Sequence, residues 1–209
     1  MKKISTQSGF TLLELVISFG VMSIVLFGVV SAFMTSIRAN ASQIDQFLAY
    51  NLAQEGLEGV RNIRDTYFRQ ALNWNGVGNV LDLVDAPFVT GKYVISRKTP
   101  SQIGTAMFNT SDLSSVKKAV PWRFDEQGGA SVASALLYRV SDSGVNYYVH
   151  QFPGEVLSGA SASPFSRVMN LAVDGDRMTV IATVTWKSYG YEKKIDLVTE
   201  LTNWKQRPY

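Results

Sequence analysis

The sequence predicts an α+β fold in which one long amino-terminal helix packs on an antiparallel β-sheet. A run from Leu15 to Met34 carries no charged side chain. Apolar residues then recur at helical spacing from Ile37 to Tyr67, and the first proline is Pro87. The last third of the chain alternates apolar and polar residues in segments separated by turn residues, which is typical of strands with one buried face.

We expect the helix to run from about Thr11 to about Gln70. At 1.5 Å per residue, Leu15 to Met34 covers about 30 Å, the thickness of the hydrocarbon core of a bilayer. The positive charges of Lys2 and Lys3 precede this span and predict a cytoplasmic amino terminus. The sequence therefore predicts a single-pass protein of the cytoplasmic membrane, in contact with membrane lipid, whose remaining residues lie outside.

The second half of the helix is predicted to be amphipathic. Its apolar stripe consists of Ile37, Ala41, Ile44, Leu48 and Leu52, followed after one slip by Leu57, Val60, Ile63 and Tyr67. Charged residues, Arg64 among them, fall mainly on the other faces. Gly56 and Gly59 each cost roughly 1 kcal/mol relative to alanine, which indicates a bend or a close contact with the sheet.

Strands are expected in the remaining part of the chain. One covers Lys92–Lys98, and residues 99–133 have no assignable pattern. A hairpin joins Leu136–Val140 to Val145–Phe152 through Ser141-Asp142-Ser143-Gly144, and a loop covers Gly154–Pro164. Three more strands, Ser166–Val173, Met178–Trp186 and Tyr191–Thr202, are joined by Asp174-Gly175-Asp176 and Ser188-Tyr189-Gly190.

The amino terminus carries the most specific signal. Lys2 and Lys3 are followed by Gly9-Phe10-Thr11-Leu12-Leu13-Glu14 and then by the apolar run. This segment resembles the processing site and stem of type IV pilins and type II secretion pseudopilins. The resemblance implies that prepilin peptidase cleaves after Gly9, that Phe10 is then N-methylated, and that the head has a pilin-like fold.

The resemblance also implies a role in assembly. In this family the carboxylate at the position of Glu14 pairs with the amino terminus of a neighbouring subunit. The partners implied are prepilin peptidase, other pilin or pseudopilin subunits bound through the helix, and an inner-membrane assembly platform. The expected organisation is a leader over 1–9, a transmembrane and filament-core helix half over 10–37, an amphipathic half over 38–72, and a globular β-rich head over 73–209.

Two other readings of the apolar run fit less well. A secretory signal has an apolar region of about 7–15 residues before its cleavage site. Ala39-Asn40-Ala41 imitates such a site, but the apolar run is longer and Arg38 interrupts the approach. A plain membrane anchor does not explain why the carboxylate of Glu14 lies near the start of the apolar run. A carboxylate costs about 2.5–3.5 kcal/mol at the centre of a membrane helix and less near the interface.

Small residues form a row along the predicted span. Gly28, Ala32 and Ser36 recur at intervals of four, and such a row lets a second helix approach closely. Incidental small residues in a membrane helix account for the row equally well.

The sequence offers little catalytic or metal-binding chemistry. His150 is the only histidine and cysteine is absent, so a His/Cys zinc site has no starting point. Asp174-Gly175-Asp176 supplies too few oxygens for calcium and reads as a hairpin turn. Tyr147, Trp204 and Tyr209 could contact partners, although core and sheet-face roles are favoured. We therefore expect no catalytic residue, no cofactor and no metal, and a chain that is not an enzyme.

Charge does not indicate nucleic acid as a partner. The chain carries a formal net charge of +3, and its basic residues form only short pairs such as Lys117-Lys118 and Lys193-Lys194. The expected function is a structural subunit of a type IV pilus-like filament, of the minor-pilin type because no cysteine is present to close a carboxy-terminal disulfide loop. A type II secretion pseudopilin and a membrane-anchored, adhesin-like binding protein are the alternatives.

Overall fold

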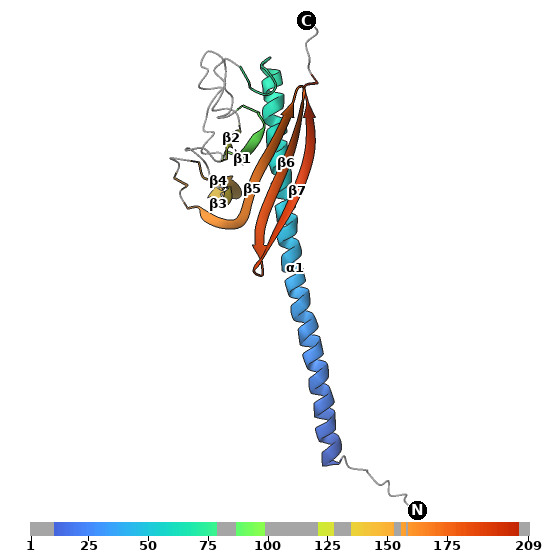
Figure 1. Ribbon diagram of the computed structural model, residues 1–209. Helices are drawn as coiled ribbons and strands as arrows, with labels where there is room; N and C mark the ends of the chain where they lie inside the picture. The colour runs from blue at the N-terminus through green and yellow to red at the C-terminus, as the bar shows by residue number, and fades with distance from the viewer. Residues whose placement is uncertain are drawn as a thin grey trace, which may run out of the picture. The chain divides into compact units, whose positions relative to one another are not determined.

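The computed structural model describes residues 11–78, 87–98, 121–127, 135–152, 156–157 and 159–204. One helix, α1 (Leu12–Arg69), is followed by seven strands (Figure 1). The strands are β1 (Gly91–Arg97), β2 (Trp122–Glu126), β3 (Leu136–Asp142), β4 (Val145–His150), β5 (Ser161–Asp174), β6 (Arg177–Ser188) and β7 (Tyr191–Thr202). The predicted pilin-like α+β fold, a long helix packed on an antiparallel sheet, is confirmed.

The chain forms two compact units, Met1–Asp45 and Gln46–Tyr209. We call the first unit the stem and the second the head. The helix α1 belongs to both, because its residues up to Asp45 lie in the stem and those from Gln46 lie in the head. The predicted processing residues Gly9 and Phe10 lie outside the described residues.

The ends of α1 follow from local hydrogen bonding. Thr11 precedes the helix, and its Oγ1 accepts a hydrogen bond from the backbone N–H of Glu14 at 3.3 Å. This is the arrangement of an N-cap, which satisfies a donor that has no partner within the helix. At the other end Ala71 adopts a φ of 57°, and the Leu72 N–H donates to the Tyr67 carbonyl at 3.0 Å. The left-handed residue turns the chain away from the helix.

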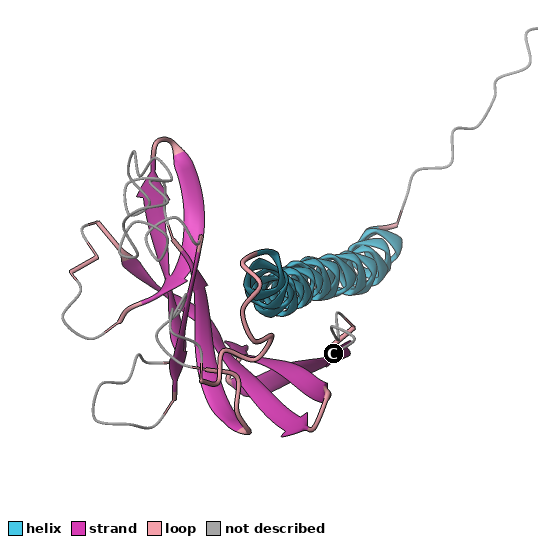
Figure 2. Cartoon of the chain, turned by 90° about the horizontal axis from the view of Figure 1, so that it is seen from above, coloured by secondary structure: helices cyan, strands magenta, loops and turns pink. Residues whose placement is uncertain are grey.

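The long strand β5 is the centre of the sheet. On one side it pairs along most of its length with β6, which in turn pairs with β7. On its other side β5 pairs with β1 near its carboxyl end and with β3 near its amino end. The strand β2 pairs with β1, the strand β4 pairs with β3, and every pairing is antiparallel. In the view from above, the strands lie along one side of the part of α1 that belongs to the head (Figure 2).

Two hairpins close with two-residue turns. In the β3–β4 turn Ser143 and Gly144 have φ values of 53° and 79°, and in the β6–β7 turn Tyr189 and Gly190 have 51° and 84°. Positive φ at both central residues is the property of type I′ turns, whose twist matches that of paired strands. Both turns fall within the turn clusters that the sequence predicted.

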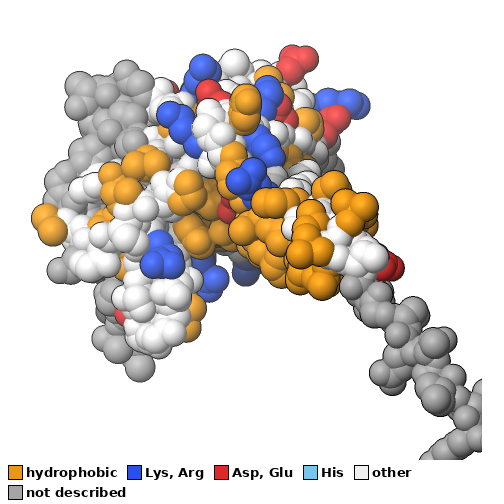
Figure 3. All heavy atoms as spheres, turned by 90° about the horizontal axis from the view of Figure 1, so that it is seen from below, with side chains coloured by type: hydrophobic (Ala, Val, Ile, Leu, Met, Phe, Trp, Pro, Cys, Tyr) orange, Lys and Arg blue, Asp and Glu red, His pale blue; other side chains and the backbone are white. Residues whose placement is uncertain are grey.

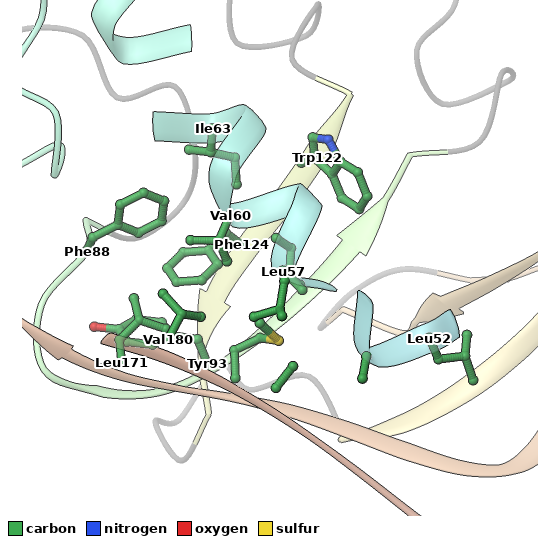
Figure 4. Close-up of a cluster of buried hydrophobic side chains, with 14 of the residues drawn as sticks. Leu52, Leu57, Val60, Ile63, Phe88, Tyr93, Trp122, Phe124, Leu171 and Val180 are labelled. Carbon is green, nitrogen blue, oxygen red and sulfur yellow. The ribbon is translucent and has the colours of Figure 1, made fainter. Parts of the chain in front are cut away.

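The core of the head lies between the helix and the sheet. Leu52, Leu57, Val60 and Ile63 of α1 form one buried cluster with side chains of the sheet such as Phe124 (Figure 4). The other labelled members of the cluster are Phe88, Tyr93, Trp122, Leu171 and Val180. Burial of so many large apolar side chains is the main source of stability in a chain without disulfides.

The helix approaches the sheet closely at its two buried glycines, Gly56 and Gly59. A Cβ atom on Gly59 would lie 2.7 Å from Ile95 Cδ1 and 2.8 Å from Trp122 Cε3, and one on Gly56 would lie 2.9 Å from Met169 Sδ. Of the two interpretations offered by the sequence, close contact with the sheet is therefore the one that the packing supports.

The predicted loop Gly154–Pro164 is wrong over its last four residues, because β5 begins at Ser161. Proline has no backbone N–H and is tolerated in a sheet at edges and bulges. The β3–β5 pairing shifts register between Leu136 and Tyr138, and the β5–β6 pairing starts only at Phe165. Pro164 therefore lies at an irregular part of the sheet, where the missing donor costs little.

Three further differences concern the helix and the unassigned segment. The strand β2 lies within residues 99–133, where Trp122 and Phe124 alternate inward. The predicted stripe is covered only from Leu48 onward, because Ile37 and Ile44 are exposed. Arg64, predicted on a polar face, is buried, with Nε and Nη2 donating to Asp65 Oδ1 at 2.9 and 2.8 Å.

Candidate functional site

The surface of the stem is apolar on every side. All residues from Thr11 to Asn40 are exposed, and large side chains such as Leu12, Ile24 and Phe27 are exposed by 82%, 74% and 76%. Figure 3 shows hydrophobic side chains covering the stem helix. A helix that is apolar all round must be buried in lipid or among other helices. It is long and apolar enough to cross a membrane and fits membrane anchoring.

Three hydroxyl groups of the stem donate hydrogen bonds within the helix. Ser18 Oγ, Ser23 Oγ and Thr35 Oγ1 donate to the carbonyl oxygens four residues earlier, at 2.7, 2.8 and 2.9 Å. In hydrocarbon an unpaired polar group costs several kcal/mol. These side chains are therefore compatible with an apolar environment and need no external partner.

Glu14 is the charged residue at the start of the apolar run. It lies in the first turn of α1, where the helix dipole favours a negative charge. Within the described residues its carboxylate has no ion-pair partner. The next charged residue along the helix, Arg38, is about 36 Å further along the axis at 1.5 Å per residue. A positive group that pairs with Glu14 must therefore come from the amino terminus or from another molecule.

The row of small residues faces open space. A Cβ atom added to Gly28 would have no heavy atom within 4 Å, and Ala32 and Ser36 follow at the four-residue spacing that places side chains on one side of a helix. A second helix could approach this side closely. The structure shows the row as accessible, and its role in packing stays a prediction.

The residues of the head that the sequence offered for metal binding are His150, Asp174 and Asp176. Within the part of the chain that the structure describes, no three His, Cys, Asp or Glu residues form a possible metal site. His150 is buried, and its backbone N–H donates to Ser96 Oγ at 3.1 Å. Asp176 belongs to the β5–β6 turn, where its Oδ1 accepts from Asn203 Nδ2 at 2.9 Å.

The aromatic candidates of the head occupy different environments. Tyr147 is half-buried on β4. Trp204 is 62% exposed, and its ring lies 5.3 Å from that of Phe68, centroid to centroid. Tyr209 lies outside the described residues. In the order of strands, Tyr147 on β4 and Trp204 just after β7 are therefore separated by β3, β5 and β6.

Sequence reasoning missed the most buried charge of the head. Arg167 is fully buried on β5, where its Nη1 donates to the Leu52 carbonyl at 2.8 Å and its Nη2 donates to the Ile95 carbonyl at 2.6 Å. Glu55 Oε2 lies 3.5 Å from Nη1. Burial lowers the pKa of Arg167, and the charge of Glu55 opposes that shift. The period of two residues in β5, which places Arg167 on the same face as Met169, was a signal for its burial.

The comparison with protein families gives one match. Residues 4–30 match the family described as "Prokaryotic N-terminal methylation motif". This range includes Gly9, Phe10 and Glu14. Comparisons with curated proteins and with solved structures give no match. The chain therefore carries a prepilin-type methylation segment, of the kind that type IV pilin-like proteins carry at their amino terminus.

Proposed function

We propose that this chain is a structural subunit of a type IV pilus-like filament, of the minor-pilin type. The properties of the amino-terminal segment are the main evidence for this proposal. This segment combines the matched methylation motif with a fully exposed apolar helix that bears a single carboxylate. Such a helix needs a membrane before assembly and neighbouring helices afterwards.

The proposed maturation and assembly of the chain have three steps. Prepilin peptidase cleaves after Gly9 in the cytoplasmic membrane, and Phe10 becomes the methylated amino terminus. The subunit is then drawn into a filament by the inner-membrane assembly platform. There the carboxylate of Glu14 pairs with the positive amino terminus of a neighbouring subunit, which removes the cost of an unpaired charge among apolar helices.

The first prediction concerns processing. We expect the membrane-extracted protein to begin at N-methylated Phe10, because Gly9 precedes an apolar residue and Glu14 follows four residues later. Intact-mass measurement of the extracted protein checks this. Replacing Gly9 with a bulky residue, as in Gly9→Leu, should leave the leader attached. A chain that starts at Met1, or at Ser42 after conventional signal cleavage, would contradict the prediction.

The second prediction concerns assembly. Glu14→Leu should leave membrane insertion and cleavage intact, because the substitution makes the stem more apolar, but it should remove the protein from filaments by about tenfold or more. Comparison of cleaved protein in membranes and in sheared filaments, in cells without the unmodified copy, provides the measurement. Ser18→Ala is the matched control, since this hydroxyl is bonded within its own helix. Normal incorporation of Glu14→Leu would refute the pairing role.

The kind of filament needs a separate measurement. Abundance relative to other subunits in sheared filaments distinguishes a minor from a major subunit. Loss of surface pili in a deletion strain supports the pilus, whereas loss of protein secretion with intact pili supports a type II secretion pseudopilus. A membrane-anchored binding protein would be absent from every filament fraction, whether or not its leader is cleaved.

A further inference from the structure

Two exposed tyrosines stand at the turn between β6 and β7. Tyr189 and Tyr191 flank Gly190, and their side chains are exposed by 61% and 75%. We call residues 187–194 the hairpin tip. Its charged residues are three lysines and one glutamate, which give a net charge of +2: Lys187, Lys193, Lys194 and Glu192. The hairpin tip therefore joins aromatic and basic side chains at a position where small polar residues are usual.

The backbone of Tyr189 indicates that this tyrosine serves more than the turn. Its φ of 51° lies in the left-handed region, which costs an ordinary L-residue about 1–2 kcal/mol. Asparagine or glycine would hold the same turn at lower cost. The exposed ring of Tyr189 offsets little of that cost by packing within the head. An unfavourable backbone conformation that the fold does not require points to a function for the side chain.

The hairpin tip lies at the end of the head where α1 enters it (Figure 1). At the opposite end of β7, the ring of Trp204 lies 5.3 Å from that of Phe68, near the last turn of α1. Halfway along, Arg167 pairs with Val184 of β6 and donates to the Leu52 carbonyl. From this contact β6 continues for about 13 Å to the tip, and the first residue of the head in α1 is about 9 Å away.

This end of the head is tethered close to the membrane. The apolar span ends at Met34, the head begins at Gln46, and α1 is continuous between them. Twelve residues of helix cover about 18 Å, so Gln46 lies within that distance of the hydrocarbon core at any tilt of the helix. The headgroup region fills about 5–7 Å of it, and membrane helices tilt by about 20° on average. A tyrosine ring at the tip can therefore reach the headgroups.

We propose that the hairpin tip binds the phospholipid headgroups of the membrane that anchors the chain. Tyrosine favours the membrane interface, where its ring meets apolar groups and its hydroxyl meets water. Lysine side chains add attraction to anionic lipid, although Lys194 also pairs with Asp196 at 2.9 Å. The contact goes beyond the proposed function, because it concerns the anchored chain before assembly. The head is then held against the bilayer and is released when the subunit leaves it.

Fluorescence quenching in the full chain tests the contact. The chain contains no cysteine, so a single introduced cysteine takes a fluorophore at one known position. The protein is placed in phosphatidylcholine vesicles that contain phosphatidylglycerol and a lipid with a nitroxide on its headgroup. A fluorophore at Glu192→Cys should be quenched several times more strongly than one at Thr202→Cys, the exposed control at the other end of β7. Equal quenching at the two positions would overturn the inference.

Replacement of both tyrosines separates binding from simple tethering. Tyr189→Asn combined with Tyr191→Thr keeps residues suited to the turn and the strand, so thermal stability should not fall. Quenching at position 192 should fall about fivefold, which corresponds to ~1 kcal/mol. Val198→Thr is the matched control, because Val198 is 63% exposed on β7 outside the tip, and it should leave quenching unchanged.

Two further results would contradict the proposal. Quenching that persists without the tyrosines would mean that the tether alone brings the tip to the bilayer. Quenching that disappears when the protein is diluted in lipid would mean that the tip meets a second copy of the chain. Either result leaves the proposed function standing, because incorporation into filaments is measured separately.

Discussion

Two charged side chains of opposite sign occupy environments that ordinarily exclude charge. Glu14 lies on an apolar stem without a partner among the described residues, and Arg167 lies at the centre of the head with two carbonyls and a carboxylate around it. A buried or lipid-exposed charge persists only where a partner compensates for lost hydration. The partner of Arg167 is within its own chain, whereas that of Glu14 is expected to come from a neighbouring subunit.

At the residue scale we predict that Arg167→Lys destabilises the head by about 1–3 kcal/mol. The planar guanidinium donates to the Leu52 and Ile95 carbonyls from two separate nitrogens, whereas the lysine side chain ends in a single nitrogen. Urea denaturation of a truncated protein that starts at Arg38 measures the loss. Arg177→Lys is the control, because Arg177 is exposed and pairs with Glu200 at the surface. Equal stability of the two variants would show that Arg167 does not hold helix and sheet together.

At the scale of the elements, α1 is one continuous helix whose two halves have different surfaces. From Leu15 to Met34 the helix is uncharged and largely apolar on every side, whereas its head residues bury only the side that meets the sheet. The change comes from the sequence, since polar residues such as Asn51 and Gln54 take the exposed side beyond Tyr50. Packing against the sheet stabilises the second half, and lipid or other stems are required to stabilise the first.

The β6–β7 hairpin gives a prediction at this scale. Tyr189 holds a positive φ, which costs an ordinary L-residue about 1–2 kcal/mol and costs asparagine less. Tyr189→Asn creates Asn-Gly, a favoured type I′ pair, and should raise the free energy of unfolding by about 1 kcal/mol. Urea denaturation of the truncated protein checks this. Tyr191→Asn is the control: it is an equally exposed tyrosine within β7, where asparagine is disfavoured, and it should give no gain.

At the scale of the whole molecule, the head should fold without the stem. Its core joins α1 from Leu48 onward to the sheet, and the stem contributes none of the buried residues. We expect a chain starting at Arg38 to be soluble and monomeric. Near-ultraviolet circular dichroism reports packing of the buried Trp74, Trp122 and Trp186, and analytical ultracentrifugation reports the mass. An unfolded or polymerising product would contradict the division into stem and head.

The sequence by itself determined the features that depend on spacing along the chain. The length of the uncharged run and the helical period up to Tyr67 predicted α1. The turn clusters and the alternation of apolar residues predicted both hairpin turns and the carboxy-terminal strands. The motif around Gly9 and Glu14 predicted the prepilin-type segment, which the family match confirms. These signals are local. The length of a membrane span, the period of a helix and the residues of a two-residue turn can each be read from one continuous stretch of the sequence.

Only the tertiary structure decided which distant residues meet. The contacts of Arg167 join residues that are 115 and 72 positions apart, and β5 pairs with β1 and β3 on the same side at different points of its length. Such pairings depend on which surfaces fit together after the strands have formed, and no spacing in the chain encodes them. For the same reason the period of the helix could not tell that Ile44 is exposed and Leu48 covered, because the sheet sets where burial begins.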